Sequence, residues 1–274
     1  MNVCLYNFEE ENIVKISLCQ LDIKFENKII NKQQVIRFIL DAKAEDVDLI
    51  IFPEMTLTGF SMNIEITAES DNDTVHMFRD LCIGQSIAIG FGWVNKVNKK
   101  AENHYTIIDK TGNIISDYIK IHPFSFSGEN EFFISGNSIC KTSLNEINMS
   151  SFICYDLRFP EIFQIISDEV ELIIVAANWP MSRREHWNTL LKARAIENQV
   201  YIAAVNCVGE KAGISYSGDS CIIDPNGNIL EQAIDEEKLI IFSIDKNEVM
   251  RVREGFPLKN DRKQDYNAMK LLDL

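Results

Sequence analysis

Short, wholly apolar runs are the feature that most constrains how this chain can fold. The runs LIIF (49–52), SIAIGFGW (86–93) and ELIIVAA (171–177) lack the polar–apolar alternation of a half-exposed strand. Runs of this kind are typical of strands covered on both faces. Segments with helical character separate them, near residues 73–83, 159–168 and 182–199. The alternation predicts an α/β architecture.

The N-terminal part begins the same alternation. Residues 14–21 (VKISLCQL) are predicted to form a buried strand. A helix is predicted from about Asn27 to Glu45. Four of its apolar side chains recur at helical spacing: Val35, Ile36, Ile39 and Leu40.

Two hairpins share one sequence pattern. The stretches IIDKTGNII (107–115) and IIDPNGNIL (222–230) both read IIDxxGNI, with Gly-Asn where a tight turn needs positive φ. The tripeptide LII also recurs, at residues 49 and 172. The pattern indicates a two-fold repeat of a half-sandwich, and convergent turn chemistry is the alternative explanation.

The chain shows no break in composition that would mark a second domain. Because no Pro-, Gly- or Ser-rich linker interrupts it, we predict one domain over residues 14–245. Residues 1–13 form an N-terminal extension in this interpretation. The more polar residues 246–274 form a tail that packs on the domain or on a partner subunit.

Charge and cysteine content exclude several classes of protein. With 27 Lys and Arg against 41 Asp and Glu, the net charge is −14, so nucleic acid and anionic membranes are not expected partners. No apolar run approaches the ~18–20 residues of a spanning helix, and the first residues, MNVCLYNFEEENI, lack the basic region of a signal peptide. Seven cysteines without a CxxC pair indicate a reduced, cytoplasmic protein.

Three reactive residues each follow a predicted strand. Glu54 follows LIIFP, Lys120 follows NIISDYI and Cys154 follows SSFI. Ligands gather beyond the carboxyl ends of strands in open α/β sheets. Each residue alone is more typical of a solvated charge or a core thiol, so the prediction of a site rests on their combination.

A carboxylate, an ammonium and a thiol make a complete set for nucleophilic acyl transfer. The thiol of Cys154, with an ordinary pKa of ~8.5, needs a base, and Glu54 is suited to take its proton. Lys120 would favour the thiolate and then stabilise the oxyanion of a tetrahedral intermediate. No metal or organic cofactor is required by this chemistry.

Motifs for other chemistries are incomplete. Gly90 and Gly92 lack the third glycine of a dinucleotide-binding fingerprint, and the chain contains neither GxxxxGK[ST] nor HExxH. The stretch GISYS (213–217) lacks the closing glycine of a GxSxG elbow. The four histidines show no metal-ligand spacing: His76, His104, His122 and His186.

Several long motifs then carry a resemblance to a known family. They are, in order, IFPEMTLTGF (51–60), YIKIHPF (118–124), ICYDLRFPE (153–161), AANWP (176–180) and HWNTLLKARAIENQ (186–199). In these segments the chain resembles the nitrilase superfamily of carbon–nitrogen hydrolases, over roughly residues 14–245. The resemblance implies a four-layer αββα sandwich, a triad of Glu54, Lys120 and Cys154, and a homodimer or higher homo-oligomer that stacks two sandwiches.

The resemblance also implies a second glutamate between the lysine and the cysteine. Glu129, nine residues after Lys120, is the matching candidate, although Glu131 lies two residues further on. The alternative is that Glu129 is a solvated loop carboxylate. The backbone N–H of Tyr155 would be the second donor to the oxyanion.

Within the superfamily, CYDLRFPE, AANWP and YSGDS (216–220) look most like the ω-amidase branch, which hydrolyses monoamides of small dicarboxylic acids. Arg158 would bind the carboxylate remote from the amide as a bidentate pair. Its alternative is an ion pair with Asp156 or Glu161. Trp179 is either a wall of the pocket or an ordinary core aromatic.

Other motif residues have ordinary structural explanations. Arg194 and Glu197 are three apart on a predicted helix and are expected to pair. Asn206 lies in VNCVG, where the family commonly reads VNRVG, so Cys207 replaces an arginine and puts one family contact in doubt. Five cysteines are expected to be inert packing thiols: Cys19, Cys82, Cys140, Cys207 and Cys221.

The sequence therefore predicts a hydrolase that cleaves the C–N bond of a small amide through a cysteine thioester. An N-carbamoyl amine, an aliphatic amide or a nitrile is the alternative substrate within the superfamily. The alternative of another class is a non-catalytic binding or thiol redox-sensing module.

Overall fold

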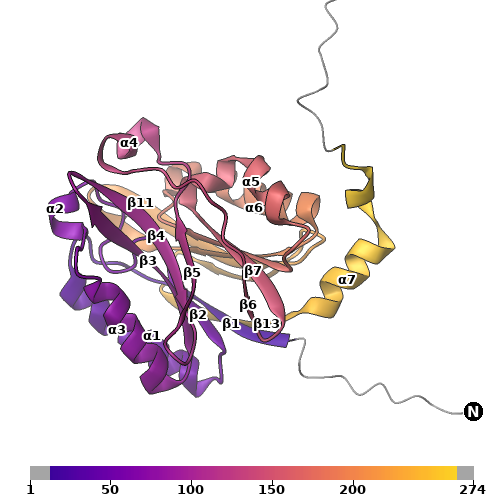
Figure 1. Cartoon of the computed structure of the whole chain (residues 1–274), viewed down its shortest axis with the longest axis horizontal. Helices are drawn as coiled ribbons and strands as arrows, with labels where there is room; N and C mark the ends of the chain where they lie inside the picture. Colours follow the sequence, from indigo (N-terminus) through magenta and orange to yellow (C-terminus); the bar gives the residue numbers. More distant parts are fainter. Residues whose placement is uncertain (1–12, 264–274) are drawn as a thin grey trace, which may run out of the picture.

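Two β-sheets packed face to face form the centre of the molecule (Figure 1). The computed structural model describes residues 13–263. Helices α1 and α3 lie outside one sheet, and α5 and α6 lie outside the other (Figure 1). This is the predicted four-layer αββα sandwich, so the expected fold class is confirmed.

The first sheet has six strands in the order β13-β1-β2-β3-β4-β5. Strand β1 runs parallel to β2, and β2 runs parallel to β3. The other three pairings, β1 with β13, β3 with β4 and β4 with β5, are antiparallel. The strand bounds are β1 Ile13–Gln20, β2 Leu49–Ile51, β3 Ala88–Val97, β4 Lys100–Ile108, β5 Ile114–Ile119 and β13 Lys238–Asp245.

The second sheet has seven strands in the order β10-β11-β9-β8-β7-β6, with β12 paired to β11. Strands β7, β8 and β9 are parallel, and β11 pairs antiparallel with both β9 and β12. The strand bounds are β6 Thr142–Leu144, β7 Ile147–Ile153, β8 Leu172–Ala177, β9 Tyr201–Asn206, β10 Val208–Lys211, β11 Ile214–Ile223 and β12 Ile229–Ile234.

The helices follow the strands as the alternation predicts. The four covering helices are α1 Lys28–Ala44, α3 Asp73–Gln85, α5 Pro160–Ile166 and α6 Arg184–Asn198. The remaining helices are α2 Ile64–Thr67, α4 Glu129–Phe132 and α7 Lys246–Gly255, with short 3-10 turns at η2 Ser125–Ser127, η3 Cys154–Arg158, η4 Met181–Arg183 and η5 Leu258–Asp261.

The two sheets repeat one topology. Three parallel strands with a helix in each crossover are followed by two antiparallel strands, first as β1-β2-β3-β4-β5 and then as β7-β8-β9-β11-β12. The hairpins β4–β5 and β11–β12 occupy equivalent places and carry the shared IIDxxGNI pattern. Gly112 and Gly227 have φ of 89° and 86°, as the tight turns require.

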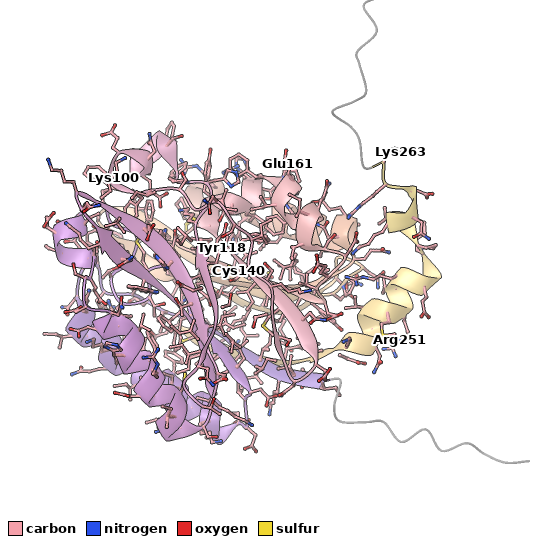
Figure 2. The ribbon with its side chains drawn as sticks, in the orientation of Figure 1. Lys100, Tyr118, Cys140, Glu161, Arg251 and Lys263 are labelled. Atoms are coloured by element: carbon pink, nitrogen blue, oxygen red, sulfur yellow. The ribbon has the colours of Figure 1, made fainter. Side chains whose placement is uncertain are left out.

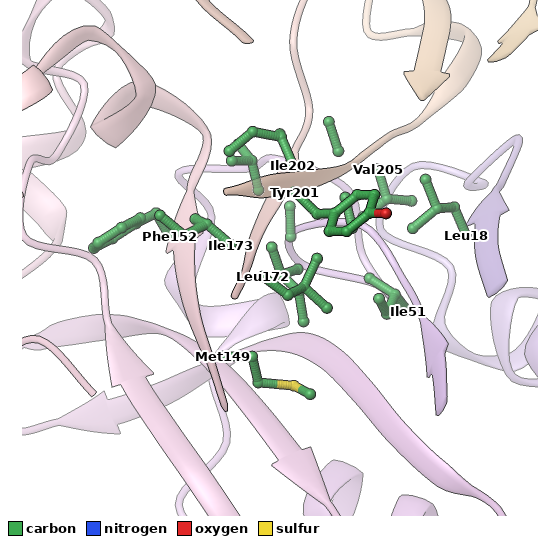
Figure 3. Close-up of a cluster of buried hydrophobic side chains, with 14 of the residues drawn as sticks. Leu18, Ile51, Met149, Phe152, Leu172, Ile173, Tyr201, Ile202 and Val205 are labelled. Carbon is green, nitrogen blue, oxygen red and sulfur yellow. The ribbon is translucent and has the colours of Figure 1, made fainter. Parts of the chain in front are cut away.

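Alternate side chains of the central strands face different layers. Leu49 and Ile51 of β2 pack against the second sheet, whereas Ile50 faces α1 and α3. Figure 3 shows the inter-sheet cluster, in which Leu18 and Ile51 lie near residues of β7, β8 and β9. Burial on both faces explains why these runs are wholly apolar.

The buried face of α1 differs in part from the apolar spacing in its sequence. Val35 and Ile39 are buried, but Ile36 and Leu40 are 39% and 49% exposed. Asn31 takes part in the buried face instead, donating from Nδ2 to the carbonyls of residues 24 and 57 and accepting the N–H of residue 24. These hydrogen bonds fix the rotation of the helix and leave one apolar stripe outside.

The C-terminal segment lies at one end of the sandwich, where Figure 2 labels Arg251 and Lys263. Helix α7 buries Val249, and the Arg253 guanidinium donates to the carbonyls of Ser167, Val170 and Gln199. The proposed extension 1–13 lies outside the described residues except for its last position, and so does the tail beyond residue 263. Within residues 13–263, none of the helices combines the length and apolar character needed to cross a membrane.

Candidate active site

Four strand ends meet at one buried place between the sheets. Glu54 and Lys120 follow β2 and β5 of the first sheet, while Cys154 and Asn178 follow β7 and β8 of the second. Glu54 and Lys120 are at most 1% exposed, and Asn178 is 4% exposed. The structure therefore brings together the three residues singled out from strand-end positions.

The backbone at two of these turns adopts an unusual conformation. Cys154 has φ of 47°, and Met55, next to Glu54, has φ of 46°. Left-handed backbone at a non-glycine residue costs of order 1–3 kcal/mol and persists only where the surrounding structure holds it, as at many functional sites. Gly92 of β3 permits the turn at Glu54, because a Cβ there would lie 2.8 Å from the Glu54 Cα.

The ammonium group of Lys120 is held between two buried carboxylates. Its Nζ lies 3.0 Å from Glu54 Oε1 and 3.0 and 2.9 Å from the two oxygens of Glu129. Glu129 is fully buried and also accepts the backbone N–H of Phe124, whereas Glu131 is exposed. Of the two candidate glutamates, the structure places Glu129 at the lysine.

Asn103 of β4 bridges the same two carboxylates. Its Nδ2 lies 2.9 Å from Glu54 Oε1 and 3.3 Å from Glu129 Oε1. Its backbone carbonyl accepts the N–H of Lys120 at 2.9 Å. Within the described residues its Oδ1 is buried without a hydrogen-bond partner. The two carboxylates that accept from its NH₂ group therefore orient the side chain.

The electrostatics of this network keep Lys120 charged. Burial alone would lower the pKa of Lys120, but the carboxylates of Glu129 and Glu54 outweigh burial and raise it above its usual value. Burial raises the pKa of Glu129, and the positive charge of Lys120 opposes that rise. Lys120 is therefore suited to stabilise negative charge and not to accept a proton.

The thiol of Cys154 lies beside this network. Its Sγ is 3.9 Å from the carbonyl oxygen of Asn178. Asn178 in turn donates its backbone N–H to Glu54 Oε2 at 2.9 Å and its side-chain amide to the Glu54 carbonyl at 2.6 Å. Burial, and next the negative charge of Glu54, raise the pKa of Cys154 well above its usual value. Cys154 therefore rests as a thiol, and it would need a base in order to act as a nucleophile.

The 3-10 turn η3, which begins at Cys154, is fixed by buried polar contacts. The Asp156 carboxylate accepts the Tyr118 hydroxyl at 2.8 Å and the N–H of Ile153 at 3.1 Å. Figure 2 shows Tyr118 in the interior of the sandwich. The Tyr155 N–H belongs to the first turn of η3, where amides have no hydrogen-bond partner within the helix itself.

Arg194 supports the same turn from α6. It pairs with Glu197 at 2.9 Å, as its spacing predicts, and it also donates to the carbonyl of Leu157 at 2.7 Å. The pairing was predicted, and the contact with η3 was not.

A cleft of about 540 Å³, its open mouth included, leads to Cys154. Its lining residues are Phe60, Phe124, Ser127, Cys154, Tyr155, Arg158, Asn178, Trp179, Pro180, Arg183, Ile214 and Tyr216.

Arg158 lies in this cleft and not in the ion pair considered as its alternative. Among residues 13–263 it has no carboxylate within 4.0 Å. Its Cζ lies 4.8 Å from the ring centre of Trp179, and its Nη2 is 3.2 Å from His186 Nδ1. Trp179 is both a core aromatic and a wall of the pocket, because its side chain is 3% exposed and still lines the cleft.

Asn206 holds the backbone that carries Trp179. Its Oδ1 accepts the Trp179 N–H at 2.7 Å, and its Nδ2 donates to the Trp179 carbonyl at 3.0 Å. Cys207, the departure from the family pattern, is fully buried and donates its thiol to Asn178 Oδ1 at 3.1 Å. The substitution therefore lies beside the candidate site.

The other predicted packing thiols are free cysteines. Cys19, Cys82 and Cys221 are buried as expected, and Cys140 is only half-buried. Within residues 13–263 no group of three or more His, Cys, Asp or Glu side chains is placed to hold a metal ion.

Sequence reasoning missed Asn103, Asn178 and Arg183. Asn103 lies in the middle of β4, where no strand-end rule applies. Asn178 directly follows β8 in AANWP, so the rule that found Cys154 could have found it. Arg183 lies three residues after AANWP, and the direction of its side chain depends on the turn η4.

Comparisons with known proteins agree with this geometry. The model of the carbon–nitrogen hydrolase family matches residues 15–254. The chain belongs to the carbon–nitrogen hydrolase family. It is an enzyme of this family, as the residues of the cleft indicated.

Individual relatives match over two thirds of the chain or more. A 2-oxoglutaramate amidase of Bacillus subtilis is 33% identical over 91% of this chain and 98% of its own. An omega-amidase of Yersinia enterocolitica is 35% identical over 68% of this chain and 72% of its own. A solved CN-hydrolase superfamily protein of Xanthomonas campestris, which has an arsenic adduct in its active site, matches with a TM-score of 0.87, 28% identity, and coverage of 94% of this chain and 99% of its own.

Proposed function

We propose that this hydrolase cleaves the terminal amide of a small dicarboxylic acid monoamide, such as 2-oxoglutaramate or 2-oxosuccinamate, to the acid and ammonia. The observation that carries the proposal is the arrangement of one cleft. Cys154 lines it and lies beside the buried Glu54–Lys120–Glu129 network, and Arg158 lines it with no carboxylate partner among the described residues. The relatives named as 2-oxoglutaramate amidase and omega-amidase support the same substrate class.

Binding places the two ends of the substrate differently. Arg158 binds the remote carboxylate through two parallel N–H···O bonds. Trp179 and Tyr155 form the wall on which the Arg158 guanidinium rests, with Cζ 4.8 and 5.9 Å from their ring centres. The amide carbon is then delivered to the Cys154 sulfur.

Acylation begins with proton transfer. Glu54 takes the proton of Cys154. Among the described residues the Glu54 Oε2 accepts only the Asn178 N–H, and a carboxylate oxygen has a further lone pair for the proton. The sulfur attacks the amide carbon, and the oxyanion lies between the Lys120 ammonium and the Tyr155 N–H. Protonated Glu54 gives its proton to the amide nitrogen, and the C–N bond breaks. Ammonia departs, and the acyl group remains on Cys154 as a thioester.

Deacylation reverses the roles. Glu54 takes a proton from water, the hydroxide attacks the thioester carbon, and Lys120 with Tyr155 again stabilises the oxyanion. The C–S bond breaks, the acid leaves, and the proton on Glu54 returns to Cys154. Glu129 holds Lys120 in place throughout, because both its oxygens are bonded to the ammonium.

We further propose a cytoplasmic location and a homodimer or higher homo-oligomer. The free cysteines support a reducing compartment, in which the Cys154 thiol remains available. Gel filtration with light scattering tests the oligomer, and a monomer at micromolar concentration would contradict it.

The function is tested by ammonia release from a panel of substrates, with Cys154→Ala alongside the wild type. The panel is 2-oxoglutaramate, 2-oxosuccinamate, an N-carbamoyl amine, an aliphatic amide and a nitrile. We expect the two carboxylate-bearing amides to give the highest kcat/KM, and no release by the variant. Faster hydrolysis of the N-carbamoyl amine, with carbon dioxide, or of the neutral substrates would overturn the proposed substrate class.

A further inference from the structure

Two arginines, and not one, line the cleft that leads to Cys154. Arg158 comes from the end of η3, and Arg183 comes from the end of η4. Within residues 13–263 neither has a carboxylate within salt-bridge distance. In a chain with 41 acidic residues, two guanidinium groups in one cleft that lack a carboxylate partner among the described residues indicate an anionic ligand.

Each guanidinium rests on its own pair of aromatic rings. Arg158 lies over Trp179 and Tyr155. The Arg183 Cζ lies 5.3 Å from the ring centre of Phe124 and 5.7 Å from that of Phe126. Stacking on aromatic faces fixes a guanidinium plane while leaving its N–H donors free. The cleft therefore offers two separate, pre-oriented sets of donors.

One carboxylate satisfies one such set. A bidentate carboxylate occupies two N–H donors of a single arginine, so a plain monoamide would leave the donors of the second arginine without an acceptor. A 2-oxo acid has a carbonyl oxygen on the carbon next to its carboxylate. This end of the molecule presents two acceptors side by side, which matches two donor sets in one cleft.

We propose that Arg183 is a specificity-determining residue that binds the 2-oxo oxygen of the substrate while Arg158 binds the neighbouring carboxylate. This inference rests on the proposed function, and it adds Arg183 as a second side chain that binds the substrate. The consequence is a preference for 2-oxo acid monoamides over monoamides that lack the oxo group.

The side chain of Arg183 can be changed without removing its structural contact. The Trp179 indole N–H donates to the backbone carbonyl of Arg183 at 2.8 Å, and this bond survives any substitution of the side chain. Arg184 offers a matched control, since it is the next residue, pairs with Asp219 at 2.6 Å and does not line the cleft.

The test compares 2-oxoglutaramate with glutaramate, which lacks the oxo group, in the wild type, Arg183→Gln and Arg184→Gln. We expect Arg183→Gln to lower kcat/KM for 2-oxoglutaramate about 10- to 100-fold more than for glutaramate, the loss of one charge-assisted hydrogen bond. Arg184→Gln leaves the ratio between the two substrates unchanged. Equal losses on both substrates, or no loss on either, would overturn the inference.

A second readout needs no turnover. Iodoacetamide alkylates Cys154, and 2-oxoglutarate or glutarate in the cleft slows this reaction. We expect 2-oxoglutarate to protect at lower concentration than glutarate in the wild type, and Arg183→Gln to abolish the difference. If no amide is hydrolysed but 2-oxoglutarate still protects better than glutarate, the proposed function fails and the role of Arg183 in binding stands. Equal protection by both acids in the wild type would refute that role.

Discussion

Replacing Glu129 by Gln tests whether the second carboxylate matters because it holds Lys120. The side chain is fully buried, and its two oxygens lie 3.0 and 2.9 Å from the lysine Nζ. Gln has the same shape but no charge. Whichever carboxylate oxygen its NH₂ group replaces, that group would face the Lys120 ammonium and either the Asn103 amide or the Phe124 N–H, all of which are donors.

The magnitude follows from the burial of the pair. Removing one partner of a buried ion pair costs about 3–5 kcal/mol, and we expect about 3 kcal/mol because Lys120 keeps Glu54 as a partner. In catalysis, loss of one pre-organised group at the oxyanion lowers kcat by about 10²–10³, which is about 3–4 kcal/mol. KM should change little, since Glu129 does not line the cleft.

The assay is steady-state ammonia release, with urea unfolding of the same preparations. Glu131→Gln is the matched control, because Glu131 is two residues away and exposed. We expect the control to stay within about 2-fold of the wild type in kcat. A Glu129→Gln enzyme that keeps kcat within about 3-fold of the wild type would refute the argument that this carboxylate positions the lysine.

Three further predictions follow from the same contacts. Asn103→Ala removes the amide that donates to both Glu54 and Glu129, so kcat should fall about 10-fold or more while KM changes little; an equal change in KM, or an unchanged kcat, would show that Asn103 does not position these carboxylates. Glu54→Gln should abolish ammonia release but lower the pKa of Cys154, so that iodoacetamide labels it faster at neutral pH; slower labelling would contradict the account. Burial lowers the pKa of His104, but its contacts with the carboxylates of Asp117 and Glu102 together outweigh burial and raise the pKa above 6.5. The stabilisation that these contacts provide is therefore complete below about pH 6.5 and is lost as pH rises through the raised value. The difference in free energy of unfolding between the wild type and His104→Gln should therefore shrink from pH 6 to pH 9 in urea titrations, and a difference that grows would show the opposite sign.

Strand ends made the core of the site predictable from sequence. Glu54, Lys120 and Cys154 each follow an apolar run, and the carboxyl ends of such strands converge whatever the details of packing. The two hairpins with one turn pattern likewise predicted the repeat of the two half-sandwiches, because a local turn determines them.

Features that depend on the rotation of an element were not predictable. Ile36 and Leu40 of α1 match the helical period as well as Val35 and Ile39 do, and only the buried hydrogen bonds of Asn31 decide which stripe faces the sheet. The roles of Asn103 and Arg183 were also not predictable. Their roles arise from what lies opposite them in the folded chain, and local sequence does not contain that information.

The central claim is that Cys154 forms a thioester with the acyl group of the substrate. The most direct measurement is rapid acid quenching of the enzyme during turnover of 2-oxoglutaramate, followed by mass spectrometry of its peptides. The account predicts an added mass equal to the acyl group on the peptide that contains Cys154, and no adduct in Cys154→Ala. An adduct on another residue, or full turnover by Cys154→Ala, would contradict it.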